Sequence, residues 1–217
     1  MIKVYMEEFN LTEGENKHER EHRQGELLLR KGLKKDYGID YGDGIPVPVI
    51  KGGHGKPQLK DYPHIFHNIS HTEGLAACGL GDVPVGIDVE LIRPFSEKII
   101  RKVMSEQEKE QFGKLKGEER TAFFFKIWTL KESYVKAAGW GITIPLTDFS
   151  FYLEPEGVTC SVPGVQVVQY CVKERYILSI CSLEQTEFCF DNSFEVDPGT
   201  KTCYDSMWRT GRTREDL

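Results

Sequence analysis

The sequence predicts an α+β fold, in which strands and amphipathic helices alternate in two successive groups. Ile2–Phe9 alternates as a strand and is followed by a long helical segment, Glu15–Tyr37. Three short strand-like runs come next, and helices and then further strands follow them. This order predicts two halves with a boundary near Glu90–Pro94. We expect an N-terminal α+β half over residues 1–90, a C-terminal α+β half over 91–190, and an irregular extension over 191–217.

Local signals justify the individual elements. Ser105 and Glu108 match a capping box, which predicts the start of a helix at Glu106. Gly139 predicts the end of the last helix, because glycine adopts the left-handed conformation that commonly ends helices. Many glycines and prolines make Tyr37–Gln58 a long connection. The expected strands are Ile65–Ile69, Leu75–Leu80, Val85–Glu90, Asp148–Leu153, Val165–Val172 and Tyr176–Leu183, and the remaining helices are Pro94–Met104, Glu106–Leu115 and Glu118–Ala138.

The composition excludes several classes of protein. The formal charge of -6 argues against a nucleic-acid binder that works through overall positive charge. No apolar run approaches the length of a membrane span, and the N-terminal residues lack a secretory pattern. The cysteines are scattered without a Cys-x-x-Cys pair, which favours reduced thiols in a cytoplasmic protein over disulfides or a structural zinc site. They are Cys78, Cys160, Cys171, Cys181, Cys189 and Cys203.

His18 and His22 enclose a His-Glu-x-x-His pattern, which is the spacing of zinc peptidases. The longer form of that pattern needs a third histidine where this chain has Leu28. A zinc-binding helix also needs an apolar back, whereas residues 16–23 are polar or charged on every side. We therefore interpret the pattern as a solvated helix end and reject zinc proteolysis.

The segment from Trp128 to Gly141 closes the helix that begins near Glu118. Glu132 and Lys136 are four residues apart and share one face of this helix. Lys131 falls instead within the apolar arc, where an ammonium group needs an anionic partner or a path to solvent. An ordinary amphipathic helix with one surface ion pair would explain these residues unless other segments supply charges that match this face.

Two other segments supply such charges. On the strand that ends at Glu90, Asp88 and Glu90 share one face while Ile87 and Val89 share the other. Two carboxylates at this spacing repel each other unless a cation lies between them. Hard oxygen ligands suit magnesium, and Glu132 would be a third ligand. The alternative is a polar strand end exposed to water.

Groups suited to an anion also occur. Ser70 and His71 end a strand with a hydroxyl and an imidazole side by side, which are donors for a phosphate. Lys56 lies between a glycine and a proline that restrict its backbone. On the first helix, Lys17, Arg20 and Arg23 add positive charge, for which solvation is the simpler explanation.

Four motifs occur in one order: Gly-Lys-Pro at 55–57, Asn-Ile-Ser-His at 68–71, Gly-Ile-Asp-Val-Glu at 86–90, and Trp-Thr-Leu-Lys-Glu-Ser-Tyr-Val-Lys-Ala-Ala-Gly at 128–139. Together they resemble the surfactin-type 4′-phosphopantetheinyl transferases, which are holo-carrier-protein synthases. The resemblance covers Lys51 to Ser150 and extends more loosely to both ends. It implies a monomer with two pseudo-symmetric halves, each a small, mostly antiparallel sheet packed with a long helix, and an active site at their interface.

The resemblance also implies a reaction. A 4′-phosphopantetheine group would pass from coenzyme A to a serine of an acyl or peptidyl carrier protein, with release of adenosine 3′,5′-bisphosphate. Asp88, Glu90 and Glu132 would hold magnesium, or manganese, against the pyrophosphate. The groups expected to bind coenzyme A are Lys17, Lys56, Ser70, His71, Lys131 and Lys136. Asp88, Glu132 and Lys136 would be catalytic: Glu132 or a metal-bound water would take the serine proton, and Lys136 would neutralise or protonate the departing phosphate.

The segment from Ile92 to Lys116 has a local net charge of +3 on a chain of -6. Carrier proteins of this class are generally acidic, so these helices could attract them, although an ordinary solvated pair of helices explains the same charges.

The capping box accounts for Glu108 without a metal. Two alternatives to the enzyme are a catalytically inactive protein that binds coenzyme A or a carrier protein, and a scaffold partner of a synthase. The basic residues of the segment from Ile92 to Lys116 are Arg93, Lys98, Arg101, Lys102, Lys109, Lys114 and Lys116.

Overall fold

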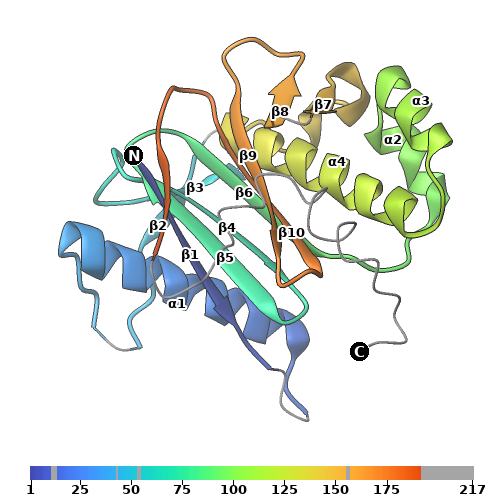
Figure 1. Cartoon of the computed structure of the whole chain (residues 1–217). Coiled ribbons are helices and arrows are strands. Elements are labelled where there is room, and N and C mark those ends of the chain that lie inside the picture. The colour runs from blue at the N-terminus through green and yellow to red at the C-terminus, as the bar shows by residue number, and fades with distance from the viewer. Residues whose placement is uncertain (11–13, 43, 53–54, 155–156, 192–217) are drawn as a thin grey trace.

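The computed structural model describes residues 1–10, 14–42, 44–52, 55–154 and 157–191 and confirms the α+β fold class (Figure 1). One sheet contains, in spatial order, β11 (Phe188–Phe190), β1 (Ile2–Glu8), β5 (Leu75–Gly81) and β4 (Phe66–Thr72). A second sheet contains β6 (Val85–Leu91), β10 (Tyr176–Ser182) and β9 (Gln166–Val172). All pairings are antiparallel except that of β1 with β11. Two hairpins are formed by β2 (Val49–Lys51) with β3 (Pro57–Leu59) and by β7 (Phe151–Glu154) with β8 (Gly157–Cys160).

Two long helices enclose the sheets from opposite sides (Figure 1). α1 (Lys17–Tyr37) packs Leu28 and Leu33 against Tyr5 and Leu80 of the four-stranded sheet. α4 (Gly117–Ala138) packs Ile127 and other buried residues against the three-stranded sheet. A separate apolar cluster joins the two sheets, and the strands contribute alternate residues to it. Its fully buried members include Ile2, Val4, Leu75, Val85, Ile87, Val89, Tyr176, Leu178 and Ile180.

Local hydrogen bonds define the ends of the helices. The Asn16 side chain accepts from the backbone N–H groups of His18 and Glu19 and caps α1. The capping box at α3 (Glu106–Lys114) is confirmed, because Ser105 and Glu108 each accept a backbone N–H of the other. Gly139 ends α4 with φ 70°, as its sequence position predicts.

Several elements differ from the expected ones. The helix expected over Pro94–Met104 is a 3₁₀ turn, η2 (Glu97–Ile99), followed by the short α2 (Ile100–Val103). The strand expected to begin at Asp148 begins at Phe151, because η3 (Gly141–Thr143) and η4 (Leu146–Asp148) occupy the preceding residues. β2, β3, β8 and β11 were not expected, since strands of three or four residues carry too short a pattern to detect.

β11 adds a strand at the end of the expected C-terminal half, where the sequence predicts none. It pairs in parallel with β1, and Asp191 at its end binds Lys31 and Lys35 of α1. A segment of the expected C-terminal half therefore completes the sheet of the N-terminal half, while the boundaries of the two halves stay a prediction. Residues 192–217 lie outside the described part of the chain.

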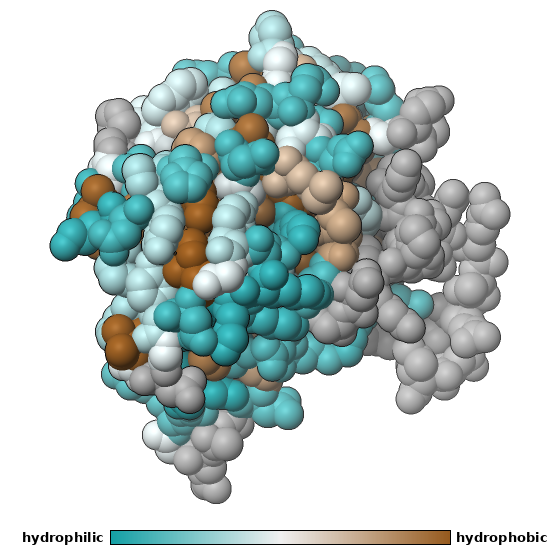
Figure 2. Space-filling model, turned by 90° about the vertical axis from the view of Figure 1, so that its left-hand side faces the viewer, coloured by the Kyte–Doolittle hydropathy of each residue, from teal (hydrophilic) through white to brown (hydrophobic). Residues whose placement is uncertain are grey.

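One face of the molecule is mainly polar, and the described cysteines are not paired in disulfides. Figure 2, which turns the left-hand side of Figure 1 toward the reader, shows a mainly polar face with apolar residues in small patches. The five described cysteines are free thiols, and Cys203 lies outside the described residues. No helix in the described part of the chain is long and apolar enough to cross a membrane.

The backbones of β6 and α4 touch at Gly86. A Cβ atom at this position would lie 1.9 Å from the Ser133 carbonyl oxygen and 2.3 Å from the Ala137 backbone nitrogen. Both obstacles are helix backbone, which cannot rotate away as a side chain would. Only glycine permits the helix to cross the strand this closely.

We predict that Gly86→Ala destabilises the protein severely. The helix must move away from the sheet, so the free energy of unfolding should fall by roughly 3 kcal/mol or more, as measured by urea denaturation. Gly113→Ala is the matched control, because nothing lies within 4 Å of its Cβ position. Gly113 lies inside α3, where alanine should stabilise by up to about 1 kcal/mol. Equal effects of the two substitutions would contradict the close contact.

Candidate active site

The contact at Gly86 brings a carboxylate of β6 and a lysine of α4 together. The Lys136 ammonium lies 2.6 Å from Asp88 Oδ1 and also donates to the Ile87 carbonyl oxygen at 3.2 Å. Asp88 is buried, whereas the Lys136 side chain is 28% exposed. Ile87 and Val89 face the core between the sheets, so the expected alternation on this strand is confirmed.

Ser70 of β4 completes a three-residue cluster with Asp88 and Lys136. Its hydroxyl donates to Asp88 Oδ1 at 2.9 Å, and its oxygen accepts from the Val89 backbone N–H at 3.2 Å and from Lys136 at 3.3 Å. Ser70 is only 6% exposed. These bonds use the hydroxyl hydrogen and both lone pairs. Ser70 therefore positions Asp88 and Lys136, and its expected role as a donor to a coenzyme A phosphate stays a prediction.

The two other acidic residues lie in the electrostatic field of Asp88. Burial, and then the charge of Asp88, raise the pKa of Glu90 above its ordinary value. The same two causes, in the same order, raise the pKa of Glu132, and Glu90 raises it further. Glu90 and Glu132 are thus harder to ionise because Asp88 is near. A cation between them would remove this mutual repulsion.

Three neighbours hold Glu90. Thr72 donates to its Oε2 at 3.4 Å, an Arg93 guanidinium nitrogen lies 3.6 Å away, and the Trp128 side chain also hydrogen-bonds to it. These three contacts were not expected from the sequence. Thr72 could have been found, because Asn68, Ser70 and Thr72 alternate along one strand face, whereas Trp128 and Arg93 approach from other elements.

The acidic group has the chemistry for a divalent cation but is not arranged around one. Asp88 Oδ2 is buried and has no hydrogen-bond partner among the described residues, so one oxygen ligand is already desolvated. In the described part of the chain, however, no three His, Cys, Asp or Glu side chains converge closely enough to hold a metal ion. The Lys136 ammonium supplies the positive charge next to Asp88 instead. The donor set fits magnesium in type, and its side chains would have to close around the ion.

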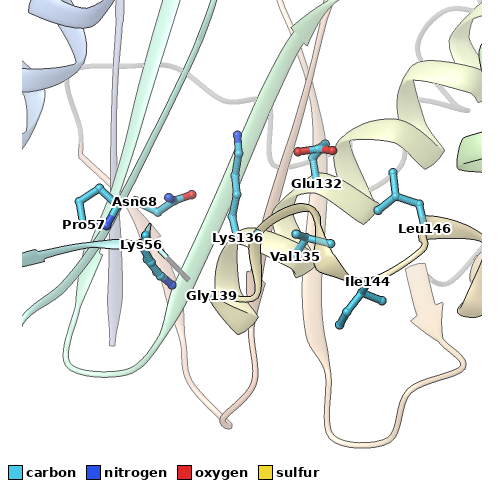
Figure 3. Close-up of a pocket in the computed structure, with 11 residues that line it drawn as sticks. Lys56, Pro57, Asn68, Glu132, Val135, Lys136, Gly139, Ile144 and Leu146 are labelled. Atoms are coloured by element: carbon cyan, nitrogen blue, oxygen red, sulfur yellow. The ribbon is translucent and has the colours of Figure 1, made fainter. Parts of the chain in front are cut away.

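A pocket of about 270 Å³ lies next to this acidic group. Lys56, Lys136 and Glu132 are its charged residues, and Lys136 stands between the other two (Figure 3). One wall is apolar. The remaining lining residues are Gly55, Pro57, Asn68, Val135, Gly139, Gly141, Ile144 and Leu146. The pocket thus combines cationic groups, one carboxylate and an aliphatic wall.

Lys56 lies at the C-terminal end of α4. Its ammonium donates to the Ala137 carbonyl oxygen at 3.0 Å and to the Val85 carbonyl oxygen at 3.1 Å. The helix end supplies partial negative charge there. Burial nevertheless lowers the pKa of Lys56 to about 8. The described residues offer it no carboxylate, so an anionic ligand in the pocket would favour its charged form.

Lys17 and His71 are linked through acidic side chains. Lys17 lies 3.2 Å from Glu73 and 3.9 Å from Glu21, and His71 Nδ1 lies 3.5 Å from Glu21. Burial lowers the pKa of His71, which Glu21 partly opposes. His71 is therefore mainly neutral at pH 7, and the Lys17 charge is largely balanced by its neighbours. The rings of His18 and His22 stack with their centroids 6.4 Å apart.

The structure overturns the expectation that Lys131 binds coenzyme A. Its side chain is 0% exposed, and its ammonium lies 2.8 Å from Glu108 Oε2. It also donates to the carbonyl oxygens of Leu146 and Phe149. Three acceptors use all three donors of the ammonium group. Lys131 therefore ties α4 to α3 and to the β7 region, and Glu108, which also accepts the Phe151 backbone N–H, is its structural partner.

Comparisons with known proteins identify the family. The family model described as the 4′-phosphopantetheinyl transferase superfamily matches residues 84–181, which contain Asp88, Glu90, Glu132 and Lys136. A 4′-phosphopantetheinyl transferase of Bacillus subtilis is 32% identical over 170 residues, which are 76% of this chain and 74% of that protein. The chain belongs to this superfamily of transferases.

Other relatives have the same name. The 4′-phosphopantetheinyl transferase Sfp of Bacillus subtilis strain 168 is 29% identical and covers 82% of this chain and 69% of its own length. A solved structure, the holo-acyl-carrier-protein synthase of Thermotoga maritima, covers 48% of this chain and 65% of its own, with 26% identity and a TM-score of 0.41. That of Bacillus anthracis, in complex with coenzyme A (3′,5′-ADP), covers 48% and 97%, with 23% identity and a TM-score of 0.43.

We predict that Lys131 and Glu108 stabilise the fold as a pair. Lys131→Met or Glu108→Gln alone leaves a buried group without its partner, and each should lower the free energy of unfolding by about 3–5 kcal/mol. The double variant should lose less than the sum of the two, as a double-mutant cycle in urea would show.

The exposed pair Lys114–Glu110 on α3 is the matched control, with side chains 68% and 73% exposed. The corresponding variants Lys114→Met and Glu110→Gln should each change the free energy of unfolding by less than about 1 kcal/mol. Additive losses at Lys131 and Glu108 would contradict the pairing.

Proposed function

We propose that this chain transfers the 4′-phosphopantetheine group of coenzyme A to a serine of an acyl or peptidyl carrier protein. One observation carries the proposal: a pocket lined by two lysines adjoins three acidic residues, in which the charge of Asp88 raises the pKa of both Glu90 and Glu132. A magnesium pyrophosphate offers the cation that the carboxylates need and the anion that the lysines need. The membership of the chain in the transferase superfamily and the names of its relatives support the same reaction.

Asp88, Glu90 and Glu132 would hold the magnesium ion. When bound, the ion would neutralise charge on the pyrophosphate and so favour departure of the nucleotide. Asp88 is the best prepared ligand, because its Oδ2 is buried and without a partner among the described residues. Glu132 borders both the acidic group and the pocket, so it can also face the substrate.

The remaining groups bind and orient the substrate. Lys56 and Lys136 would contact phosphate oxygens, while His71 and Lys17 would lie toward the nucleotide, where a bound phosphate would favour a protonated imidazole. Lys136 contacts Asp88 and also lines the pocket, so its ammonium group can stabilise the negative charge that develops on the leaving phosphate. The hydrogen bonds of Ser70 with Asp88 and Lys136 hold these two side chains in position.

The reaction forms one phosphorus–oxygen bond and breaks another. The carrier serine oxygen attacks the phosphorus attached to pantetheine, and the bond to the phosphate of the nucleotide breaks, which releases adenosine 3′,5′-bisphosphate. The serine hydroxyl loses its proton in this step, and Glu132, which lines the pocket, or a metal-bound water would accept it. Lys136 neutralises the departing phosphate.

A basic surface on η2 and α2 fits the acidic carrier protein. Lys109 and Lys114 pair with glutamates of their own helix, and Arg120 pairs with Glu97, so much of the local charge is internally balanced. In the described chain, no ion pair involves Lys98, Arg101 or Lys102. Together with Lys116, which also forms no ion pair in the described chain, these three residues are the part of the segment that can attract an acidic partner.

The decisive experiment is intact mass spectrometry of an apo carrier protein incubated with this protein, coenzyme A and magnesium. We expect a gain of the mass of one phosphopantetheine group, which a chelator abolishes. Glu132→Gln should slow the transfer by at least about 100-fold, because it removes both a metal ligand and the proton acceptor.

Glu119→Gln is the control for this variant, because Glu119 is exposed near the start of the same helix. It should leave the rate unchanged. Coenzyme A binding without transfer to any of several unrelated carriers would favour a catalytically inactive binding protein. Carrier binding that needs neither magnesium nor coenzyme A would favour a scaffold.

We further predict that coenzyme A affinity falls with pH because of Lys56. Below pH 8 the Lys56 ammonium is charged and adds no pH dependence to the affinity; above pH 8 binding must first restore its proton, which costs about tenfold in affinity per pH unit. Isothermal titration calorimetry between pH 7 and 9.5 measures this dependence. Lys56→Arg should remove it, since arginine stays charged, whereas the same change at exposed Lys60 should not. An unchanged profile in Lys56→Arg would assign the titration to another group.

A further inference from the structure

Asn68 lies in the pocket with its side-chain orientation fixed by a backbone group. Its Oδ1 accepts the N–H of Ile87 at 2.8 Å. Since only the carbonyl oxygen of an asparagine side chain can accept, this bond determines which end of the amide is which. The amide NH₂ group is therefore the free end, and Figure 3 shows the side chain extending from β4 toward Lys136.

Protein groups do not satisfy this NH₂ group. No hydrogen bond from Asn68 Nδ2 occurs among the described residues. The ammonium groups of Lys56 and Lys136 are donors and cannot accept, and the Glu132 carboxylate in the lining does not accept from the Asn68 NH₂ group. The NH₂ group therefore has no protein partner among the described residues. An oxygen of a ligand is the partner that it lacks.

The position of Asn68 indicates which part of a ligand it meets. Ser70, two residues along the same strand face, contacts Asp88, so Asn68 lies roughly 7 Å from that contact along β4. In the pocket it shares the space with the aliphatic side chains of Val135, Ile144 and Leu146. An oxygen attached to an aliphatic group, at roughly 7 Å from the contact between Ser70 and Asp88, matches this environment.

We propose that Asn68 donates its side-chain amide to an oxygen of the phosphopantetheine half of coenzyme A, and so recognises the group that is transferred. The inference rests on the proposed function. The phosphopantetheine half has hydroxyl, amide and phosphate oxygens on an aliphatic chain with two methyl groups. Adenosine 3′,5′-bisphosphate, the product, lacks that half. The contact therefore favours the substrate over the product.

The strand itself suggests the variant that tests this contact. Ser70 and Thr72 follow Asn68 on the same face, and their hydroxyl oxygens accept the N–H groups of Val89 and Leu91 as Asn68 accepts that of Ile87. Asn68→Thr therefore keeps an acceptor for the Ile87 N–H and removes the amide donor without adding charge. Asn68→Ala removes both functions and should destabilise the protein in urea.

The experiment is calorimetric titration of wild-type protein and Asn68→Thr with coenzyme A and, separately, with adenosine 3′,5′-bisphosphate, both with magnesium. We expect Asn68→Thr to bind coenzyme A roughly tenfold more weakly and the bisphosphate within about twofold of wild type, with unfolding by urea unchanged. Equal weakening of both ligands would place the acceptor oxygen in the nucleotide and overturn the proposal.

Unchanged binding of both ligands would show that Asn68 serves the fold alone, which also overturns it. Failure of the wild-type protein to bind coenzyme A is a separate result, because it would overturn the proposed function together with this inference. The two failures are therefore distinguished by the wild-type titration.

Discussion

The contact between the backbones of α4 and β6 at Gly86 determines where every charged group of the site lies. Because no side chain separates helix and strand, Lys136 on the helix reaches Asp88 on the strand at 2.6 Å, and Glu132, one turn earlier, comes into the field of Asp88 and Glu90. The same crossing places the carbonyl end of α4 over Lys56. A methyl group at position 86 would push the helix away from the strand and separate these charges. The electrostatics of the site therefore depend on this close packing.

Lys131 and Lys136 have different roles although they lie only five residues apart on α4. Lys131 is fully buried, and its ammonium is satisfied by Glu108 and two carbonyl oxygens, so it connects elements of the C-terminal part of the chain. Lys136 is partly exposed and keeps contact with the pocket. Burial in a low-dielectric environment makes an unpaired charge costly, which explains why the first lysine has a dedicated carboxylate while the second shares Asp88 with Ser70.

β4 is the edge strand of the four-stranded sheet and contacts β6 of the other sheet through its side chains. Asn68, Ser70 and Thr72 present side-chain oxygens to successive N–H groups of β6, so side chains replace the backbone carbonyls that an adjacent strand would offer. The first of these three residues, Asn68, also lines the pocket. The side-chain hydrogen bonds to β6 explain why polar residues alternate on β4 next to the acidic group. The residues that hold the sheets together are thus also those that shape the site.

From the sequence alone we could predict the α+β class, the caps at Ser105 and Gly139, the alternation that puts Asp88 and Glu90 on one strand face, and the four motifs of the family. These features depend on residues close in the chain, where spacing fixes geometry. The folded structure was needed to show that Lys131 pairs with Glu108, that Ser70 is saturated by Asp88, Lys136 and Val89, that Asn68 lines the pocket, and that β11 pairs with β1. Each of these outcomes depends on contacts between residues far apart in the chain, which local periodicity does not encode. Burial and partner atoms, and therefore the charge and the free donors of a side chain, exist only once the segments have packed.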